Sequence, residues 1–161
     1  MIDRRYLLAG LALGGGVIAA PMLFAKSSRP QAAPGWRLSD AEWKKRLTAQ
    51  QYYVLREAGT ERPFSHPLDK EKRAGTFVCA GCALPLYSST AKYDSKTGWP
   101  SFWAPLKGGI ATSTDYDLGY ARVEVHCKRC GGHLGHVFND GPKPTGKRYC
   151  MNGAALTFRP A

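Results

Sequence analysis

The chain has 161 residues, enough for one ordinary domain with a short extension and too few for two full domains. Hydrophobic residues make up 43% of it, which excludes a disordered tail, and no long apolar stretch follows the first two dozen residues, which excludes a multi-span membrane protein. The formal net charge of +11 permits an anionic partner without requiring one.

The amino-terminal residues have the composition of an export signal. Arg4 and Arg5 precede a weakly apolar run over residues 9–20, with small residues nearby. The arginine pair resembles a twin-arginine signal, and the glycines of the run make it less hydrophobic than a stop-transfer anchor. We therefore predict an export signal over residues 1–25 and a periplasmic location, with an uncleaved membrane tether as the alternative. Residues 26–35, with their prolines and serines, are predicted to form a linker.

The rest of the chain, residues 36–161, is predicted to form one domain that begins with a helix. Ser39 and Glu42 have the spacing of a capping box, in which each side chain bonds to the backbone of the other residue. The apolar residues that follow lie near helical spacing, and Gly59 ends the pattern. The spacing predicts one amphipathic helix over residues 40–57, unbroken or broken near Thr48.

Beyond Gly75 the sequence changes to short β-rich runs separated by glycine and proline. The run at residues 122–127 alternates strictly and places Val123, Val125 and Cys127 on one face. Further candidate strands lie at residues 76–79, 84–87 and 155–158. Short strands with frequent turn residues predict a mainly β, antiparallel domain that carries an amino-terminal helix.

Four of the five cysteines form two Cys-x-x-Cys pairs of identical spacing, Cys79 with Cys82 and Cys127 with Cys130. Four thiolates can surround one Zn²⁺ ion as a closed, tetrahedral, structural site. The long gap between the pairs means that the metal would join two distant loops of one domain. Two alternatives are disulfides, which an exported protein can form, and a redox pair of the thioredoxin type. Two matched pairs favour the metal site over both.

The fifth cysteine, Cys150, is a candidate nucleophile. A lone cysteine is more often a small buried hydrophobic residue, but Arg148 supplies a cation that would favour the thiolate. His133 and His136 offer imidazoles that could exchange protons with a substrate. Trp99 lies in an aromatic, turn-rich segment that forms either part of the core or the apolar wall of a pocket.

Five motifs occur in a fixed order along the domain and accompany the cysteine pairs. They are Thr-Glu-Arg-Pro-Phe at residues 60–64, Gly-Trp-Pro-Ser-Phe at 98–102, His-Leu-Gly-His-Val-Phe at 133–138, Asp-Gly-Pro at 140–142 and Arg-Tyr-Cys at 148–150. From about Trp36 to Phe158 the chain resembles the methionine-R-sulfoxide reductase family of the B type. The resemblance implies two antiparallel sheets in a β-tent-like arrangement around a shallow site, with a structural four-cysteine zinc site on the side away from the chemistry.

The resemblance also implies an activity, which is the thiol-dependent reduction of methionine R-sulfoxide, free or in proteins, through a sulfenic acid on Cys150. It implies oxidised proteins or free methionine sulfoxide as substrates and a thioredoxin-like protein as reductant. The residues that it assigns to catalysis are Cys150, His136, His133, Asp140 and Asn152. Those that it assigns to substrate binding are Trp99, which would pack on the substrate methyl group, Arg148 and Phe138.

The sequence departs from the family pattern at a position that matters for turnover. Many members carry a second, recycling cysteine immediately before Gly-Trp-Pro-Ser-Phe, and here that residue is Thr97. Either an external thiol attacks the oxidised Cys150, or a cysteine of the metal site is recruited at the expense of the metal. We expect the external thiol. Two smaller departures are Gly153, where serine is common, and the His66-Pro67 pair.

A different class of function is a zinc-ribbon-like module that binds nucleic acid, or a redox chaperone without reductase activity. The first would cluster its lysines and arginines on one face, with aromatic residues between them. Here the charge is spread along the chain. We therefore expect no nucleic-acid partner, and no stable membrane partner beyond export or a tether.

Overall fold

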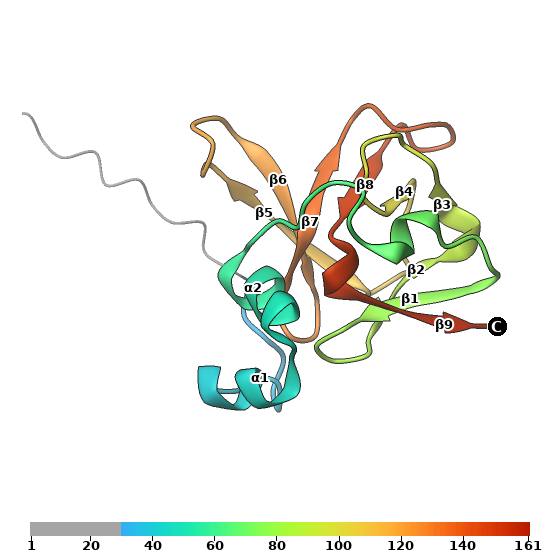
Figure 1. Cartoon of the computed structure of the whole chain (residues 1–161). Coiled ribbons are helices and arrows are strands. Elements are labelled where there is room, and N and C mark those ends of the chain that lie inside the picture. Colours follow the sequence, from blue (N-terminus) through green and yellow to red (C-terminus); the bar gives the residue numbers. More distant parts are fainter. Residues whose placement is uncertain (1–29) are drawn as a thin grey trace, which may run out of the picture.

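The computed structural model describes residues 30–161 as two antiparallel sheets with two helices at one end (Figure 1). The predicted export signal and residues 26–29 of the predicted linker lie outside the described residues, so both remain predictions. Within residues 30–161, no helix has the length and apolar character needed to cross a membrane.

Two short helices replace one continuous helix, and the break falls near Thr48. The first, α1, spans Asp40–Arg46 and begins with the predicted capping box of Ser39 and Glu42. The second, α2, spans Ala49–Glu57 and has its own capping box, between Thr48 and Gln51. It ends on Ala58 in the left-handed conformation rather than on Gly59. A second cap inside the apolar pattern is what divides the predicted helix.

The smaller sheet has the order β2-β1-β9 and joins the middle of the domain to its carboxyl end. Its strands are β1 (Gly75–Cys79), β2 (Pro85–Ser88) and β9 (Leu156–Pro160). All three match predicted strands to within two residues. Phe77 in the central strand pairs with Tyr87 on one side and Phe158 on the other.

The larger sheet has the order β3-β4-β8-β7-β6-β5. Its strands are β3 (Lys92–Tyr93), β4 (Ser101–Phe102), β5 (Ile110–Asp115), β6 (Arg122–Cys127), β7 (His133–Phe138) and β8 (Arg148–Met151). Only β6 was predicted, with the same bounds. Of its predicted apolar face, Val125 and Cys127 are buried, whereas Val123 is 45% exposed because it lies near the loop that joins β5 to β6.

The core lies between the two sheets and fixes the position of β8. Tyr87 stacks on Phe102 with 4.3 Å between ring centroids, and its hydroxyl donates to the sulfur of Met151 at 3.1 Å. Three 3-10 helices complete the fold, at Pro67–Lys70, Ser89–Ala91 and Gly153–Ala155. Because Met151 is buried in this core, its neighbour Cys150 points to the opposite face of the strand.

Candidate active site and metal centre

Cys150 lies in a central strand of the larger sheet, where it pairs with Ser101 of β4 on one side and His136 of β7 on the other. Its half-buried side chain opens into a cavity of about 150 Å³. The residues that line the cavity are Thr60, Trp99, Arg122, Gly135, His136, Phe138, Cys150 and Asn152. Four other predicted site residues therefore line one cavity with Cys150, namely Trp99, His136, Phe138 and Asn152.

Gly135 allows β7 to come close to the Cys150 backbone. A Cβ atom at this position would lie 2.1 Å from the carbonyl oxygen of Cys150, so any other residue would push the two strands apart. The glycine therefore keeps His136 and Cys150 on adjoining strands of one cavity wall.

Hydroxyl groups and a cation surround the Cys150 thiol. The Oγ1 atom of Thr97 lies 3.8 Å from the Cys150 sulfur, and Ser95 connects Thr97 to Ser101 through hydrogen bonds of 2.8 and 2.7 Å. Burial raises the pKa of Cys150, and Thr97, Arg148 and Ser101 offset part of that rise by stabilising the thiolate. The site therefore holds a thiol that depends on its polar neighbours to ionise.

Arg148 contacts two other predicted site residues, Asp140 and Phe138. Its guanidinium donates to both carboxylate oxygens of Asp140, at 2.9 and 2.8 Å, and lies 4.3 Å from the ring centroid of Phe138. The Asp140 side chain is 61% exposed and is not among the residues that line the cavity. Its observed contact is with Arg148, so the structure gives it the geometry of a positioning residue.

His136 is held by a carboxylate that the sequence analysis did not single out. Its Nε2 atom donates to Oδ2 of Asp115 at 2.7 Å, and Arg122 donates to the same oxygen. Burial opposes ionisation of Asp115, but the Asp117 amide, His136 and Arg122 outweigh it and hold its pKa below the usual range. Burial lowers the pKa of His136, and Asp115 limits that decrease. Asp115 and Arg122 are paired residues where β5 and β6 meet their connecting loop. Opposite charges at such a cross-strand pair are the feature of the sequence that could have pointed to Asp115.

His133 is fully buried and is not among the residues that line the cavity. Its Nδ1 atom donates to Oε1 of Glu124 at 2.6 Å, and His126 lies 3.3 Å from the other oxygen of that carboxylate. Burial alone would raise the pKa of Glu124, but the two histidines outweigh that effect and hold the pKa below the usual range. The ring centroids of His133 and His136 are 5.4 Å apart. His133 is therefore a buried neighbour of His136 that does not line the cavity.

Glu61, from the first motif, connects Trp99 to Asn152. Its backbone oxygen accepts from Trp99 Nε1 at 3.1 Å, and its backbone amide donates to Oδ1 of Asn152 at 3.0 Å. The Asn152 amide group donates to the oxygen of Leu134 at 3.2 Å, so both ends of that side chain are bonded to backbone. The Glu61 carboxylate accepts from the amides of Gly153 and Ala154. Glu61 belongs to the first motif, but the resemblance assigns it no role in the site.

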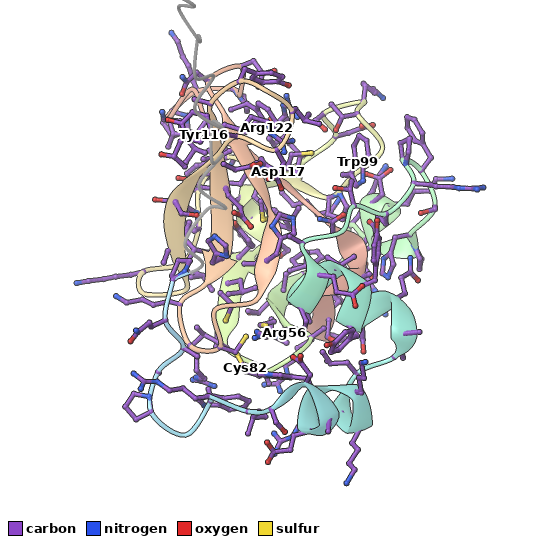
Figure 2. The ribbon with its side chains drawn as sticks, turned by 90° about the vertical axis from the view of Figure 1, so that its left-hand side faces the viewer. Arg56, Cys82, Trp99, Tyr116, Asp117 and Arg122 are labelled. Carbon is purple, nitrogen blue, oxygen red and sulfur yellow. The ribbon has the colours of Figure 1, made fainter. Side chains whose placement is uncertain are left out.

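The four cysteines of the two pairs converge at the opposite end of the domain, where Figure 2 shows Cys82 and Arg56 far from Trp99 and Arg122. All four are buried, and their sulfur atoms lie within 4.8 Å of one another. The Cys79 and Cys130 sulfurs are 3.7 Å apart and those of Cys82 and Cys127 are 3.4 Å apart, too long for disulfide bonds. This donor set can hold a metal ion, and four ligands at about 2.3 Å from a zinc ion would lie at comparable separations.

Comparison with known proteins agrees with this geometry. The family model described as the SelR domain matches residues 47–160. The peptide methionine sulfoxide reductase MsrB of Leptospira interrogans is 53% identical over 122 residues, which cover 75% of this chain and 93% of the relative. The MsrB of Agrobacterium fabrum is 49% identical over 129 residues, covering 80% and 96%. The chloroplastic reductase B1 of Arabidopsis thaliana is 51% identical over 120 residues, covering 74% and 59%.

Proposed function

The chain belongs to the SelR-domain family of MsrB-type peptide methionine sulfoxide reductases, and on that basis we propose that it reduces methionine R-sulfoxide to methionine with Cys150 as the nucleophile. The observation that carries the proposal is that Cys150, His136 and Trp99 line one small cavity. The family match does not favour the nucleic-acid module or the chaperone as alternatives.

The reaction needs a thiolate and a proton donor on the same sulfoxide. The sulfur of a sulfoxide becomes electrophilic when its oxygen is protonated or strongly hydrogen-bonded. His136 has its Nε2 atom committed to Asp115, which leaves Nδ1 as the ring nitrogen that can exchange a proton. Cys150, its thiolate stabilised by Arg148 and Thr97, attacks the substrate sulfur.

The net first step transfers one oxygen atom. The sulfoxide and the Cys150 thiol become methionine and a Cys150 sulfenic acid, so the sulfoxide is reduced by two electrons and the cysteine is oxidised by two. A second thiol then condenses with the sulfenic acid to give a mixed disulfide and water, and a third thiol releases Cys150 as the free thiol.

Trp99 is proposed to determine the stereochemistry. Its indole is held by the bond to the Glu61 carbonyl and faces the cavity beside Phe138. In the R epimer the substrate methyl would lie on this apolar wall, whereas exchange of methyl and oxygen would bury the oxygen against indole. An unpaired buried polar group costs about 1–3 kcal/mol, which favours one epimer.

We propose that the cysteine cluster holds one structural zinc ion. Cys79, Cys82, Cys127 and Cys130 would supply all four ligands, leaving no open position for chemistry. A bound zinc ion would join the turn after β1 to the turn after β6 and so stabilise the fold under the two helices.

We further propose that an external thiol, of the thioredoxin type, recycles Cys150, since Thr97 is the hydroxyl residue beside its sulfur. If the predicted signal directs export, the substrates are oxidised envelope proteins and the reductant acts outside the cytosol. Separation of cell fractions tests the location, because a mature protein found only in the cytosol would contradict it.

The experiment that tests the activity is reduction of each epimer of free methionine sulfoxide with dithiothreitol, by the wild type and Cys150→Ser. We expect activity on the R epimer alone and its loss in the variant. Inactivity of a folded, metal-loaded wild type on both epimers would refute the proposed function.

A further inference from the structure

Exposed apolar side chains concentrate on one hairpin beside the cavity. Across residues 30–161, six large hydrophobic side chains are exposed, and three of them lie within five consecutive residues. Tyr116, Leu118 and Tyr120 are 55%, 60% and 59% exposed. They form what we call the hairpin tip, residues 116–120, in the connection between β5 and β6. A local cluster of this kind is typical of an interaction surface.

The hairpin tip is joined directly to the site. Asp115, which precedes it, binds His136, and Arg122, which begins the returning strand, lines the Cys150 cavity. Figure 2 shows Tyr116 and Asp117 at the same end of the molecule as Arg122 and Trp99. The tip is therefore continuous with the rim of the cavity.

A further exposed apolar residue, Phe64, contacts Gly98, which precedes Trp99 in the chain. Phe64 is 64% exposed, and its amide donates to the carbonyl oxygen of Gly98 at 2.7 Å. A Cβ atom at Gly98 would lie 2.7 Å from the Phe64 nitrogen, so the glycine allows this close contact next to Trp99. Phe64 is therefore an exposed apolar neighbour of the Trp99 segment that does not itself line the Cys150 cavity.

The cavity itself is too small to account for these residues. A volume of about 150 Å³ suits one side chain, since an engineered cavity of that size holds benzene. The residues before and after an oxidised methionine must lie outside it, on the rim. The Gly119 amide donates to the Tyr116 carbonyl oxygen at 2.8 Å, and this turn holds the tip directly after Asp115, whose side chain binds His136.

The charge of the hairpin tip distinguishes a polypeptide from a lipid surface as the partner. Residues 116–121 contain one carboxylate, that of Asp117, and no lysine or arginine. Adsorption to anionic membranes requires free cations beside the apolar groups, and the adjacent cation, Arg122, is paired with Asp115. An unfolded polypeptide exposes apolar side chains without the dense negative charge of an anionic membrane.

We propose that the hairpin tip binds apolar residues that flank the oxidised methionine of an unfolded polypeptide. The proposal rests on the proposed function and deepens it, because it assigns the enzyme a preference for protein substrates with apolar sequence around the methionine. Free methionine sulfoxide would use the cavity alone, so its reduction would not depend on the tip.

The test compares three substrates on the full-length, metal-loaded protein. They are free methionine R-sulfoxide, a capped heptapeptide with methionine R-sulfoxide between glycines and serines, and one with leucines and valines beside it. We expect kcat/KM to be about tenfold higher for the apolar peptide, through a lower KM, because one buried apolar side chain is worth about that factor. A triple variant, Tyr116→Ser with Leu118→Ser and Tyr120→Ser, should reduce the advantage to less than about twofold.

Controls separate this proposal from the proposed function. Tyr53→Ser removes a 48% exposed aromatic of α2 and should keep the full preference. Unchanged activity of the triple variant on free methionine R-sulfoxide shows that its site is intact. Leu118→Ser alone is the milder variant if the triple variant does not fold.

A wild type that reduces both peptides equally, or a folded variant that keeps the preference, would overturn this inference alone. Tip-dependent binding to phosphatidylglycerol vesicles without peptide preference would assign the tip to membranes and also overturn it. Failure of the wild type on all three substrates would refute the proposed function.

Discussion

The Nε2 atom of His136 lies 2.7 Å from Oδ2 of Asp115, an oxygen that also accepts from Arg122. The two residues come from non-adjacent strands, β7 and β5, and meet across the intervening strand. A carboxylate in this position fixes the ring orientation and the tautomer of a histidine. Asp115 therefore sets which nitrogen of His136 faces the substrate cavity.

Asp115→Asn tests this coupling. Asp115 raises the pKa of His136 against the effect of burial, so the variant should lower that pKa further. Because His136 acts as the acid in the proposed mechanism, the alkaline limb of the pH–rate profile should move to lower pH. The rate on free methionine R-sulfoxide at neutral pH should fall by about tenfold to a hundredfold.

Asp117→Asn is the matched control, since it changes the next carboxylate of the same hairpin, which does not contact His136. Its profile should match the wild type. A normal rate with an unshifted alkaline limb in Asp115→Asn would mean that His136 is not the acid.

Local sequence predicted that the four cysteines would form one cluster, and it drew attention to Cys150, because both signals are short in sequence. Each Cys-x-x-Cys pair predicts two ligands three positions apart, and the resemblance of the motifs to a known family pointed to Cys150. The capping box at Ser39 likewise predicted the start of α1. These features depend on neighbours a few residues away.

The partners of the site residues could not be predicted in the same way. Asp115 and His136 are 21 positions apart, and Glu61 and Gly153 are 92 apart, so their contacts depend on strand register and chain crossing. Strands β3 and β4 have two residues each, too few for any alternation to be visible. Strand β7 carries Gly135 in its interior, a residue that ordinarily weakens a strand pattern.

Arg148→Ala should make the Cys150 thiol harder to ionise. Burial raises the pKa of Cys150 and Arg148 opposes that rise, so the variant's pKa should be higher. The acidic limb of the pH–rate profile, and the pH dependence of Cys150 alkylation, should both move to higher pH. Loss of one charge-assisted contact costs about 1.5–3 kcal/mol, so activity at neutral pH should fall by about tenfold or more.

Arg148→Lys keeps the charge and should restore part of the alkylation rate, whereas Asp140→Asn should lower activity only as far as it releases Arg148 from its bidentate contact. Alkylation of Cys150→Ser gives the background. Identical pH dependence in wild type and Arg148→Ala would show that the guanidinium does not stabilise the thiolate.

Loss of the proposed zinc ion should unfold the domain rather than block its chemistry directly. The cysteine cluster joins two turns beneath α2, where a Cβ atom at Gly81 would contact Leu55 and Trp43. Structural zinc sites contribute about 10 kcal/mol or more to folding, comparable with the whole stability of a domain. Cys127→Ser should therefore contain no zinc by metal analysis and show a much lower Tm.

Cys150→Ser is the control for that measurement, because it removes a thiol outside the cluster. It should keep one equivalent of zinc and the Tm of the wild type. Retention of full stability by a metal-free Cys127→Ser protein would rule out the structural role.

Thr97→Cys should change how the oxidised enzyme is resolved. Thr97 Oγ1 lies 3.8 Å from the Cys150 sulfur, so a thiol at this position would be within reach of a Cys150 sulfenic acid. After one turnover without reductant, the wild type should carry a sulfenic acid that dimedone traps. The variant should instead lose one water and form an intramolecular disulfide, which mass spectrometry distinguishes by peptide mapping.

The matched control is Thr112→Cys, which adds an exposed cysteine in the middle of β5, on a strand that does not pair with β8. It should behave as the wild type and give the dimedone adduct, because its thiol is not beside Cys150. A wild type that forms a disulfide between Cys150 and a cysteine of the cluster would contradict the external-thiol route.

In Thr97→Cys the internal disulfide should form faster than an external thiol can attack, because the neighbouring group has a high effective concentration. The rate of turnover should then depend on reduction of that disulfide, and a dithiol reductant should support it better than a monothiol.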